Sequence, residues 1–351
     1  MQKKRILSLF IVLALSLSMW PMSALAVSKG ALSGSCGENL TWTLSADGVM
    51  TISGAGELYK AGWPSEDTSE WKTLVNSTTE IVIEEGITHL QTYGLADFYK
   101  VTKVTLPSTL ELIGIGAFSN CRALKNIFIP EGVTYIAADA FYNCIALESA
   151  FISSSVEVIE TEVTVGYAFG NCLSLKEIKV DEENKVFQDI NGVLTSKAGT
   201  LLVYPCGLTN DYYAVPDNIK TIGDSAFKGN EHLTDIELPD GLEYIAYMAF
   251  NDCSKIKEIT IPSTVNRIWW LAFKNCAELR DIYFCGSAPE IAPGAFSPFS
   301  NGVLLHYREG STGWTTPTWN GYQTALWEDE PSGSTAKILQ LFPENGSTNA
   351  G

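Results

Sequence analysis

Eight cysteines and three histidines are the residues of this chain with the most potential as nucleophiles, bases or metal ligands. A Cys–His nucleophilic pair requires hydrogen-bond contact and an accessible thiol of low pKa. His89, His232 and His306 lie far apart in the sequence. No H-E-x-x-H, G-x-S-x-G, C-x-x-C or phosphate-binding glycine motif occurs. The sequence therefore predicts no catalytic residues, no metal site and no cofactor.

Five of the cysteines share one position, three residues after the Phe of a recurring Ala-Phe pair. They are Cys121, Cys144, Cys172, Cys253 and Cys276, and other copies place Phe98, Asn230 and Phe299 there. A position that accepts Phe is expected to be buried, and Cys behaves there as a small hydrophobe. Stacked rungs about 4.8 Å apart would not forbid disulfides. We favour buried free thiols, and we assign no partner to Cys36, Cys206 or Cys285.

These positions belong to a 23-residue repeat that reads I-x-I-P-x-x-V-x-x-I-x-x-x-A-F-x-x-C-x-x-L-x-x. Such a period indicates a solenoid, in which each unit buries its apolar side against the next. The Ile-x-Ile step predicts a short strand with its flanking residues inward, and the Ala-Phe pair predicts a short helical turn. We expect a mainly β solenoid of about nine rungs with one continuous core. The rungs begin near Ile81, Val104, Ile127, Ala150, Ile178, Tyr213, Ile236, Ile259 and Ile282.

The segments outside the regular period predict caps and an insertion. In the entry module, residues 27–80, the alternation over 40–53 around Asp47-Gly48 predicts a β-hairpin cap. A cluster of Tyr59, Trp63 and Trp71 is expected to pack on the first rung. The rung that begins at Ile178 is 35 residues long, and its turns at 191–192 and 197–199 predict an inserted β-meander. The solenoid, residues 81–327, ends in a Trp-rich cap that contains Trp314, Trp319 and Trp327.

The N-terminus and the charge predict export. Basic residues, an apolar run and Ala24-Leu25-Ala26 make residues 1–26 a signal peptide, whereas a membrane anchor would need a longer run. Cleavage removes three positive charges and takes the net charge from −17 to −20. Nucleic acid and anionic lipid are therefore poor partners. We expect a secreted or cell-surface protein that does not insert into a membrane after signal cleavage.

The repeat IPEGVTYIAADAFYNCIALES resembles the BspA-like leucine-rich repeats of bacterial surface proteins, over about residues 81–300. The segment GSCGENLTWTLSADGVMTISGAGEL is similar to the leader of such repeats. The resemblance implies a leucine-rich-repeat β-solenoid used for adhesion and protein recognition, without catalytic residues. Residues 328–351 contain a polar linker and ILQLFPENGSTNAG, which resembles the start of a bacterial immunoglobulin-like domain. A disordered tail is the alternative for this segment.

The outward residues of the predicted strands suggest a ligand-binding site. Phe128 and Phe151 share a column on adjacent rungs, Asn126 precedes Phe128, and Tyr135 and Val158 belong to a second outward column. A loop at 161–165 is expected to form one wall. The prediction is a monomeric recognition module that binds an extracellular protein or glycan through the solenoid face. The alternative is a structural stalk, or the non-catalytic targeting arm of a larger surface protein or enzyme.

Overall fold

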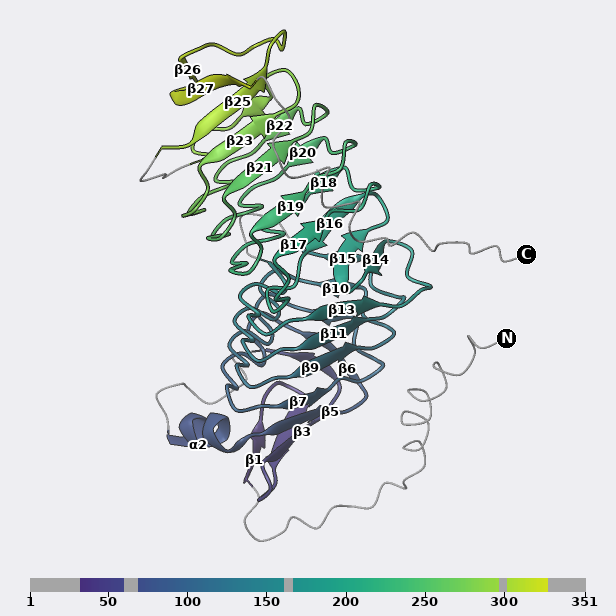
Figure 1. Ribbon diagram of the computed structural model, residues 1–351. Coiled ribbons are helices and arrows are strands. Elements are labelled where there is room, and N and C mark those ends of the chain that lie inside the picture. Colours follow the sequence, from purple (N-terminus) through teal and green to yellow (C-terminus); the bar gives the residue numbers. More distant parts are fainter. Residues whose placement is uncertain (1–31, 60–68, 161–166, 297–301, 328–351) are drawn as a thin grey trace, which may run out of the picture.

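The computed structural model describes residues 32–59, 69–160, 167–296 and 302–327, which stack into an elongated β-solenoid (Figure 1). The only helix in these residues is α2 (Ser69–Ser77). Each rung contributes a first strand and a second strand, and each kind stacks in parallel with its counterparts. The first strands are β5 (Glu80–Ile83), β7 (Lys103–Thr105), β9 (Asn126–Ile129), β11 (Ser149–Ile152), β13 (Glu177–Val180), β17 (Tyr212–Ala214), β19 (Asp235–Glu237), β21 (Glu258–Ile261), β23 (Asp281–Phe284) and β25 (Leu304–Arg308). The second strands are β6 (Ile87–Leu90), β8 (Leu112–Ile113), β10 (Tyr135–Ile136), β12 (Val158–Ile159), β16 (Thr200–Val203), β18 (Thr221–Ile222), β20 (Tyr244–Ile245), β22 (Arg267–Ile268) and β24 (Glu290–Ile291). This architecture confirms the predicted mainly β solenoid.

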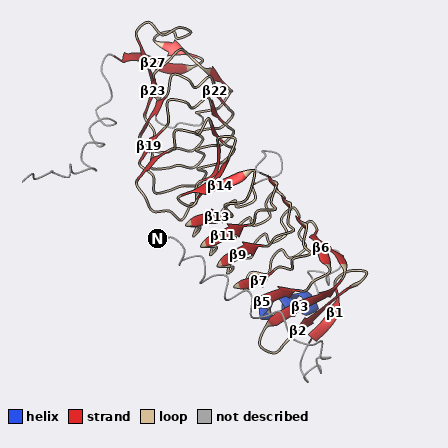
Figure 2. Cartoon of the chain, turned by 90° about the vertical axis from the view of Figure 1, so that its right-hand side faces the viewer, coloured by secondary structure: helices blue, strands red, loops and turns tan. Residues whose placement is uncertain are grey.

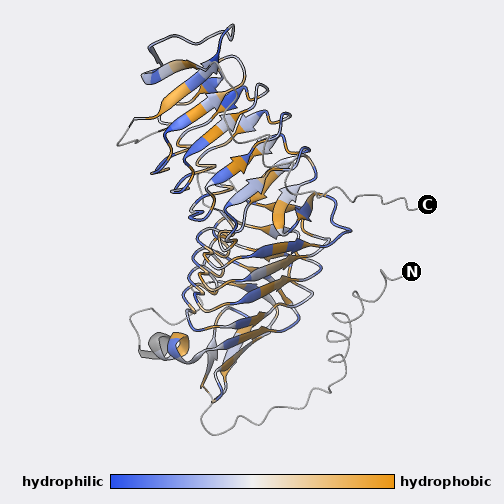
Figure 3. Ribbon diagram, viewed as in Figure 1, coloured by the Kyte–Doolittle hydropathy of each residue, from blue (hydrophilic) through white to orange (hydrophobic). Residues whose placement is uncertain are grey.

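Alternation within the first strands places one side chain inside and the next outside. In β9, Ile127 and Ile129 are buried while Asn126 and Phe128 are exposed. Successive strands keep the same register, so that Ala150 lies beside Ile127 and Phe151 beside Phe128. Apolar and polar residues accordingly alternate along the strands in Figure 3. The period-2 pattern therefore produces both a core and an outward column of side chains.

The Ala-Phe segments form turns, so the predicted short helical turn is wrong. The Phe118 N–H donates to the Ala140 carbonyl of the next rung at 2.7 Å, and the rings of Phe118 and Phe141 stack with centroids 5.4 Å apart. Left-handed residues flank the Phe, at Gly116 (φ 59°) and Asn120 (φ 62°). Such residues interrupt helical geometry, and they direct the backbone bonds toward the neighbouring rung.

The N-terminal cap continues the first-strand stack. β1 (Leu32–Ser35), β2 (Leu40–Leu44) and β3 (Val49–Gly54) are antiparallel, and β3 then pairs in parallel with β5. The predicted hairpin is confirmed. β4 (Gly56–Leu58) begins the second-strand stack by pairing with β6. The expected packing of Tyr59 is wrong, since its ring is 48% exposed and its hydroxyl donates to Glu57. Trp63 and the side chain of Trp71 lie outside the described residues.

The insertion is a hairpin placed between the first and second strands of one rung. β14 (Phe187–Ile190) and β15 (Val193–Ser196) are antiparallel around Asn191-Gly192, and β15 pairs with β16 across the second predicted turn. The predicted meander is thereby confirmed. β16 then joins the second-strand stack beside β18. The Tyr204 ring takes the place of the missing Phe, stacked 5.0 Å from Phe227, so the long rung is complete.

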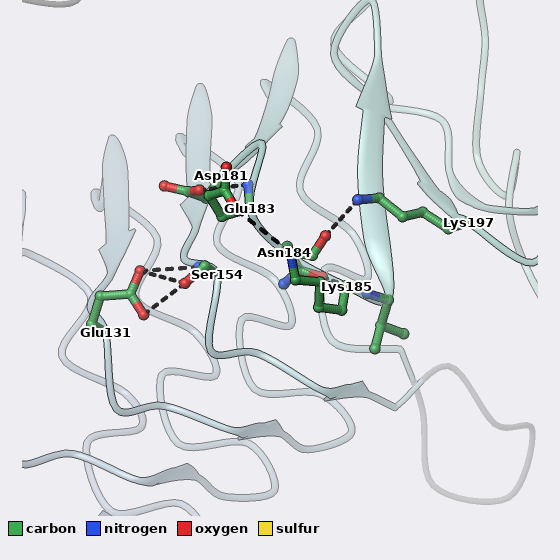
Figure 4. Close-up of polar contacts among 8 residues, drawn as sticks. Glu131, Ser154, Asp181, Glu183, Asn184, Lys185 and Lys197 are labelled. Atoms are coloured by element: carbon green, nitrogen blue, oxygen red, sulfur yellow. Dashed lines mark hydrogen bonds and ion pairs between the residues drawn. The ribbon is translucent and has the colours of Figure 1, made fainter.

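Buried Asn184 fixes the start of the insertion to the rung below. Its Nδ2 donates to the carbonyls of Ser153 and Val156, both at 2.9 Å. Its Oδ1 accepts from the N–H groups of Val186 and Phe187. Lys197, directly after β15, donates to the Asn184 carbonyl, as Figure 4 shows.

The core consists of two clusters, and the expectation of one continuous core is wrong. The N-terminal cluster runs from Cys36 to Leu194, and the C-terminal cluster from Val193 to Leu305. The sheet of second strands changes at the same place, since β12 ends one sheet and β16 belongs to the next. The reason is the inserted hairpin, which separates the rungs on either side of it (Figure 2).

The C-terminal end is covered by aromatic side chains. β27 (Tyr322–Trp327) is parallel to β25 and antiparallel to β26 (Thr318–Trp319), and it pairs with both. Trp314, Trp319 and Tyr322 pack against the C-terminal cluster. The predicted loop at 161–165, Phe299 and residues 328–351 lie outside the described residues.

Candidate functional site

Phe128 and Phe151 form a stacked pair on the outer side of the first strands, the first-strand face. Their ring centroids are 4.8 Å apart and the planes differ by 3°. The parallel register of β9 and β11 produces this geometry, because it sets the two residues side by side. Phe128 is 59% exposed, whereas Phe151 is half-buried. An aromatic side chain this exposed contributes little to the core and offers a contact surface.

Polar and charged side chains surround the pair. The Ser149 hydroxyl donates to Asn126 Oδ1 at 2.8 Å, which places Asn126 beside the rings. Lys179 lies next to Phe151 in the register, and its ammonium is 3.2 Å from Asp189. Two rungs below Phe151, Lys103 pairs with Glu80 at 2.6 Å. An apolar centre with a polar rim is the arrangement found in protein interfaces.

Tyr135 and Val158 lie on a different sheet from Phe128, Phe151 and Asn126. They belong to β10 and β12, which pair with each other in the second-strand stack. Figure 2 shows β9 and β11 on one edge of the N-terminal half and the second strand β6 on the opposite edge. Val158 is 39% exposed, and the Tyr135 hydroxyl donates to Glu160. The structure therefore brings together three of the five predicted residues and separates the other two.

The C-terminal half of the first-strand face is acidic. Asp235, Glu237, Glu258 and Asp281 are all outside the core. Glu237 accepts a hydrogen bond from the Tyr212 hydroxyl, and Asp281 is 2.7 Å from His306. Glu237 and Asp281 therefore each have a local partner.

Neither the histidines nor the ladder cysteines form a catalytic arrangement. His89 contacts Thr88, and His306 contacts Asp281. Burial raises the pKa of the Cys144 and Cys276 thiols to about 12, so these groups are protonated at neutral pH. Within the described ranges, no three His, Cys, Asp or Glu side chains are placed to hold a metal ion.

Lys179 and Ser149 lie beside the Phe pair, as the register of adjacent rungs requires. One exposed feature escaped the sequence reasoning. Trp269 and Trp270 lie at the surface after β22, and Trp270 is 49% exposed. Aligning the rungs residue by residue would have found the two tryptophans, because most other rungs place a small or polar residue at the position of Trp269.

Comparison with known proteins places these features in a family. The model of the BspA type leucine rich repeat region matches in six copies, over residues 74–190 and 204–302. No curated protein matches the chain. Among the described residues, no helix has the length and apolar character needed to cross a membrane.

Solved structures with the same fold come from bacteria. A leucine-rich repeat protein from Eubacterium ventriosum has 23% identity and a TM-score of 0.61, over 80% of this chain and 79% of that one. The pneumococcal vaccine antigen PcpA has 21% identity and a TM-score of 0.56, over 77% of this chain and 80% of that one. At such identity the likeness concerns the fold alone.

Proposed function

Because this chain belongs to the BspA-type leucine-rich repeat family, we propose that it is a secreted or cell-surface recognition module of a bacterium. It binds an extracellular protein or glycan through the first-strand face, at Phe128, Phe151 and Asn126. The stacked, exposed Phe pair is the observation that carries this proposal. Membership of the family supports the general role, since leucine-rich repeat solenoids provide extended binding surfaces.

The chemistry of the face favours a protein over a glycan at this place. Phe rings offer apolar area without a hydrogen-bonding group, and aromatic residues dominate the energetics of protein interfaces. The rim formed by Asn126, Ser149 and Lys179 supplies polar contacts that orient a partner. The similarity in fold to a pneumococcal vaccine antigen supports display outside the cell. The acidic character of the chain supports the absence of nucleic acid as a partner.

The test is binding to an array of purified extracellular proteins. Replacing both rings (Phe128→Ala with Phe151→Ala) should weaken binding by about 2 kcal/mol or more, roughly thirtyfold, because an aromatic anchor that the partner covers is lost. Thr105→Ala is the matched control, since Thr105 occupies the same outward column one rung below Phe128. It should leave affinity unchanged. Equal affinity of the double variant and the wild type would contradict the proposal.

A further inference from the structure

A second group of aromatic residues lies on the C-terminal half, away from the first-strand face. It consists of Tyr244 on β20, Tyr247 after β20, and Trp269 and Trp270 after β22. We call it the tryptophan surface. Figure 2 shows β22 on the edge opposite to the first strands β19 and β23. Trp270 is 49% exposed and the other three are half-buried, so none of them belongs to the core.

Packing of the solenoid does not require Trp269. In the column that follows the inward residue of each second strand, most other rungs place a small residue (Gly114, Ala137, Gly223, Ala246 and Ala292), and the remaining rungs place Gln91, Glu160 and Leu202. Small residues suit this column, since a Cβ on Gly223 would lie 2.8 Å from the Leu201 carbonyl oxygen. Trp269 therefore stands between Ala246 and Ala292 on the neighbouring rungs.

Charged groups surround the rings and are held in place. Arg267 lies between Tyr244 and Glu290 in the register of the second strands. Its Nε and Nη2 donate to Glu290 Oε2 at 2.9 and 2.7 Å, and its guanidinium carbon is 5.5 Å from the Trp269 ring. Asp224 Oδ1 accepts from the Tyr247 N–H at 2.9 Å. Burial and then the charge of Asp224 raise the pKa of Tyr244.

This combination matches the chemistry of a sugar. The C–H face of a pyranose stacks on an aromatic ring, while its hydroxyl groups bond to carboxylate, guanidinium and phenol groups. Arg267 and Glu290 neutralise each other on a chain of net charge −17, so the surface favours an uncharged ligand over an anionic one. The surface spans two rungs, roughly 5 Å apart. That extent suits a few sugar units better than a protein interface, which needs about 20 residues on each side.

We propose that the tryptophan surface binds a neutral oligosaccharide. Trp269 and Trp270 supply stacking faces, and Tyr244, Asp224 and Arg267 supply hydrogen bonds to hydroxyl groups. This site is separate from the Phe128–Phe151 pair and does not depend on it.

The experiment uses the full chain on an array of neutral, sialylated and sulfated glycans, followed by titration calorimetry with the neutral oligosaccharide that binds best. Trp270→Ala and Trp269→Ala should each lower its affinity at least tenfold. Trp270→Ala is the safer variant, because its exposed side chain can be removed with little effect on folding. The thermal unfolding midpoint of each variant is measured alongside.

Tyr142→Ala serves as the control and should leave glycan affinity unchanged, since Tyr142 is an exposed aromatic residue outside both surfaces. Failure of any neutral glycan to bind would overturn the proposal, as would a preference for charged glycans. Glycan affinity that is unchanged in Trp270→Ala would also overturn it. So would loss of a protein partner, rather than of a glycan, on removal of Trp270.

Discussion

At the residue level, the ladder cysteines have a structural role that repeats from rung to rung. Cys144 donates its thiol hydrogen to the Phe118 carbonyl at 3.2 Å, and Cys253 donates to Phe227 at 3.1 Å. Each bond joins a buried side chain to the rung below. In a Cys253→Ser variant the Phe227 carbonyl could accept a hydrogen bond from the new hydroxyl. The predicted buried, apolar position is confirmed by the zero exposure of both residues.

The burial of these thiols predicts their reactivity. The five ladder cysteines should resist a thiol-specific reagent in the native protein, because the reactive thiolate is strongly disfavoured there. All five should react after denaturation without a reducing agent. Mass spectrometry of labelled peptides measures the extent of labelling at each cysteine in the native and in the denatured protein. Half-buried Cys206 is the internal comparison. Disulfides between ladder cysteines, or rapid native labelling of Cys253, would contradict this expectation.

Glu85 should make stability depend on pH. Its carboxylate accepts from the N–H and hydroxyl of Ser108 and from the Thr109 N–H. The Ser108 N–H is the largest cause that lowers the pKa of Glu85. A carboxyl whose pKa is lower in the folded state stabilises the fold above its unfolded pKa, about 4.3. That stabilisation is lost as pH falls through the folded pKa.

The measurement is the thermal midpoint of Glu85→Gln between neutral and acidic pH. The variant should be less stable than the wild type at pH 7, and the difference should disappear once the pH lies below the folded pKa. Glu84→Gln removes one negative charge from the neighbouring exposed position and controls for net charge. A difference that persists undiminished in acid would show that the carboxylate charge is irrelevant.

At the level of elements, the repeat predicted most of the fold because burial and register follow directly from its periodicity. Ile127, Ile129 and Phe118 are buried, and Phe128 is exposed, as the spacing indicates. The turn at the Ala-Phe pair was mistaken for helix because an apolar pair in a short window does not distinguish the two. The sequence did not predict that Tyr135 and Phe128 lie on different sheets, because the repeat pattern carries no information on the angle between the first and second strands of a rung.

Glycine at a rung corner provides a test of how tightly the rungs approach. Gly132 has φ of 105°, and a Cβ there would lie 2.6 Å from the Ser108 carbonyl oxygen. Gly132→Ala should therefore lower the free energy of unfolding by about 2 kcal/mol or more. Gly241 occupies the same rung position, where a Cβ would lie 3.7 Å from the Asp217 carbonyl oxygen. Gly241→Ala should change stability by less than about 1 kcal/mol. Denaturant unfolding of both variants gives the comparison, and equal losses would refute the steric explanation.

At the level of the whole molecule, the two core clusters meet at β15. The two halves also touch on another side, where the Lys228 ammonium lies 3.2 Å from the Tyr167 hydroxyl and 4.8 Å from its ring. These contacts, with the backbone hydrogen bond from the Gly207 N–H to the Leu175 carbonyl at 2.7 Å, replace the regular rung-on-rung stacking found within each half. In a repeat protein, stability is the sum of the repeats and their interfaces, so a weak interface divides the molecule energetically.

Because the core is divided into two clusters, we expect the N-terminal and C-terminal halves of the solenoid to unfold partly independently. Gly132→Ala should accelerate native-state amide exchange in β7 to β12 and leave β19 to β23 protected as in the wild type. Hydrogen exchange followed by mass spectrometry resolves the two halves. Gly241→Ala is the control for substitution at the equivalent position in the other half. Equal acceleration throughout the chain would show that the solenoid unfolds as one unit.

The most direct test of recognition through the first-strand face is site-specific photo-crosslinking. Benzoylphenylalanine replaces Phe128 in one variant and Thr260 in another, the latter an outward residue of the first-strand face in the C-terminal half. Each is irradiated with the extracellular protein that binds best on the array. Position 128 should form a covalent adduct with that protein, and position 260 should form little or none. An adduct at position 260 alone, or at neither position while binding is intact, would contradict the assignment of the binding face to Phe128 and Phe151.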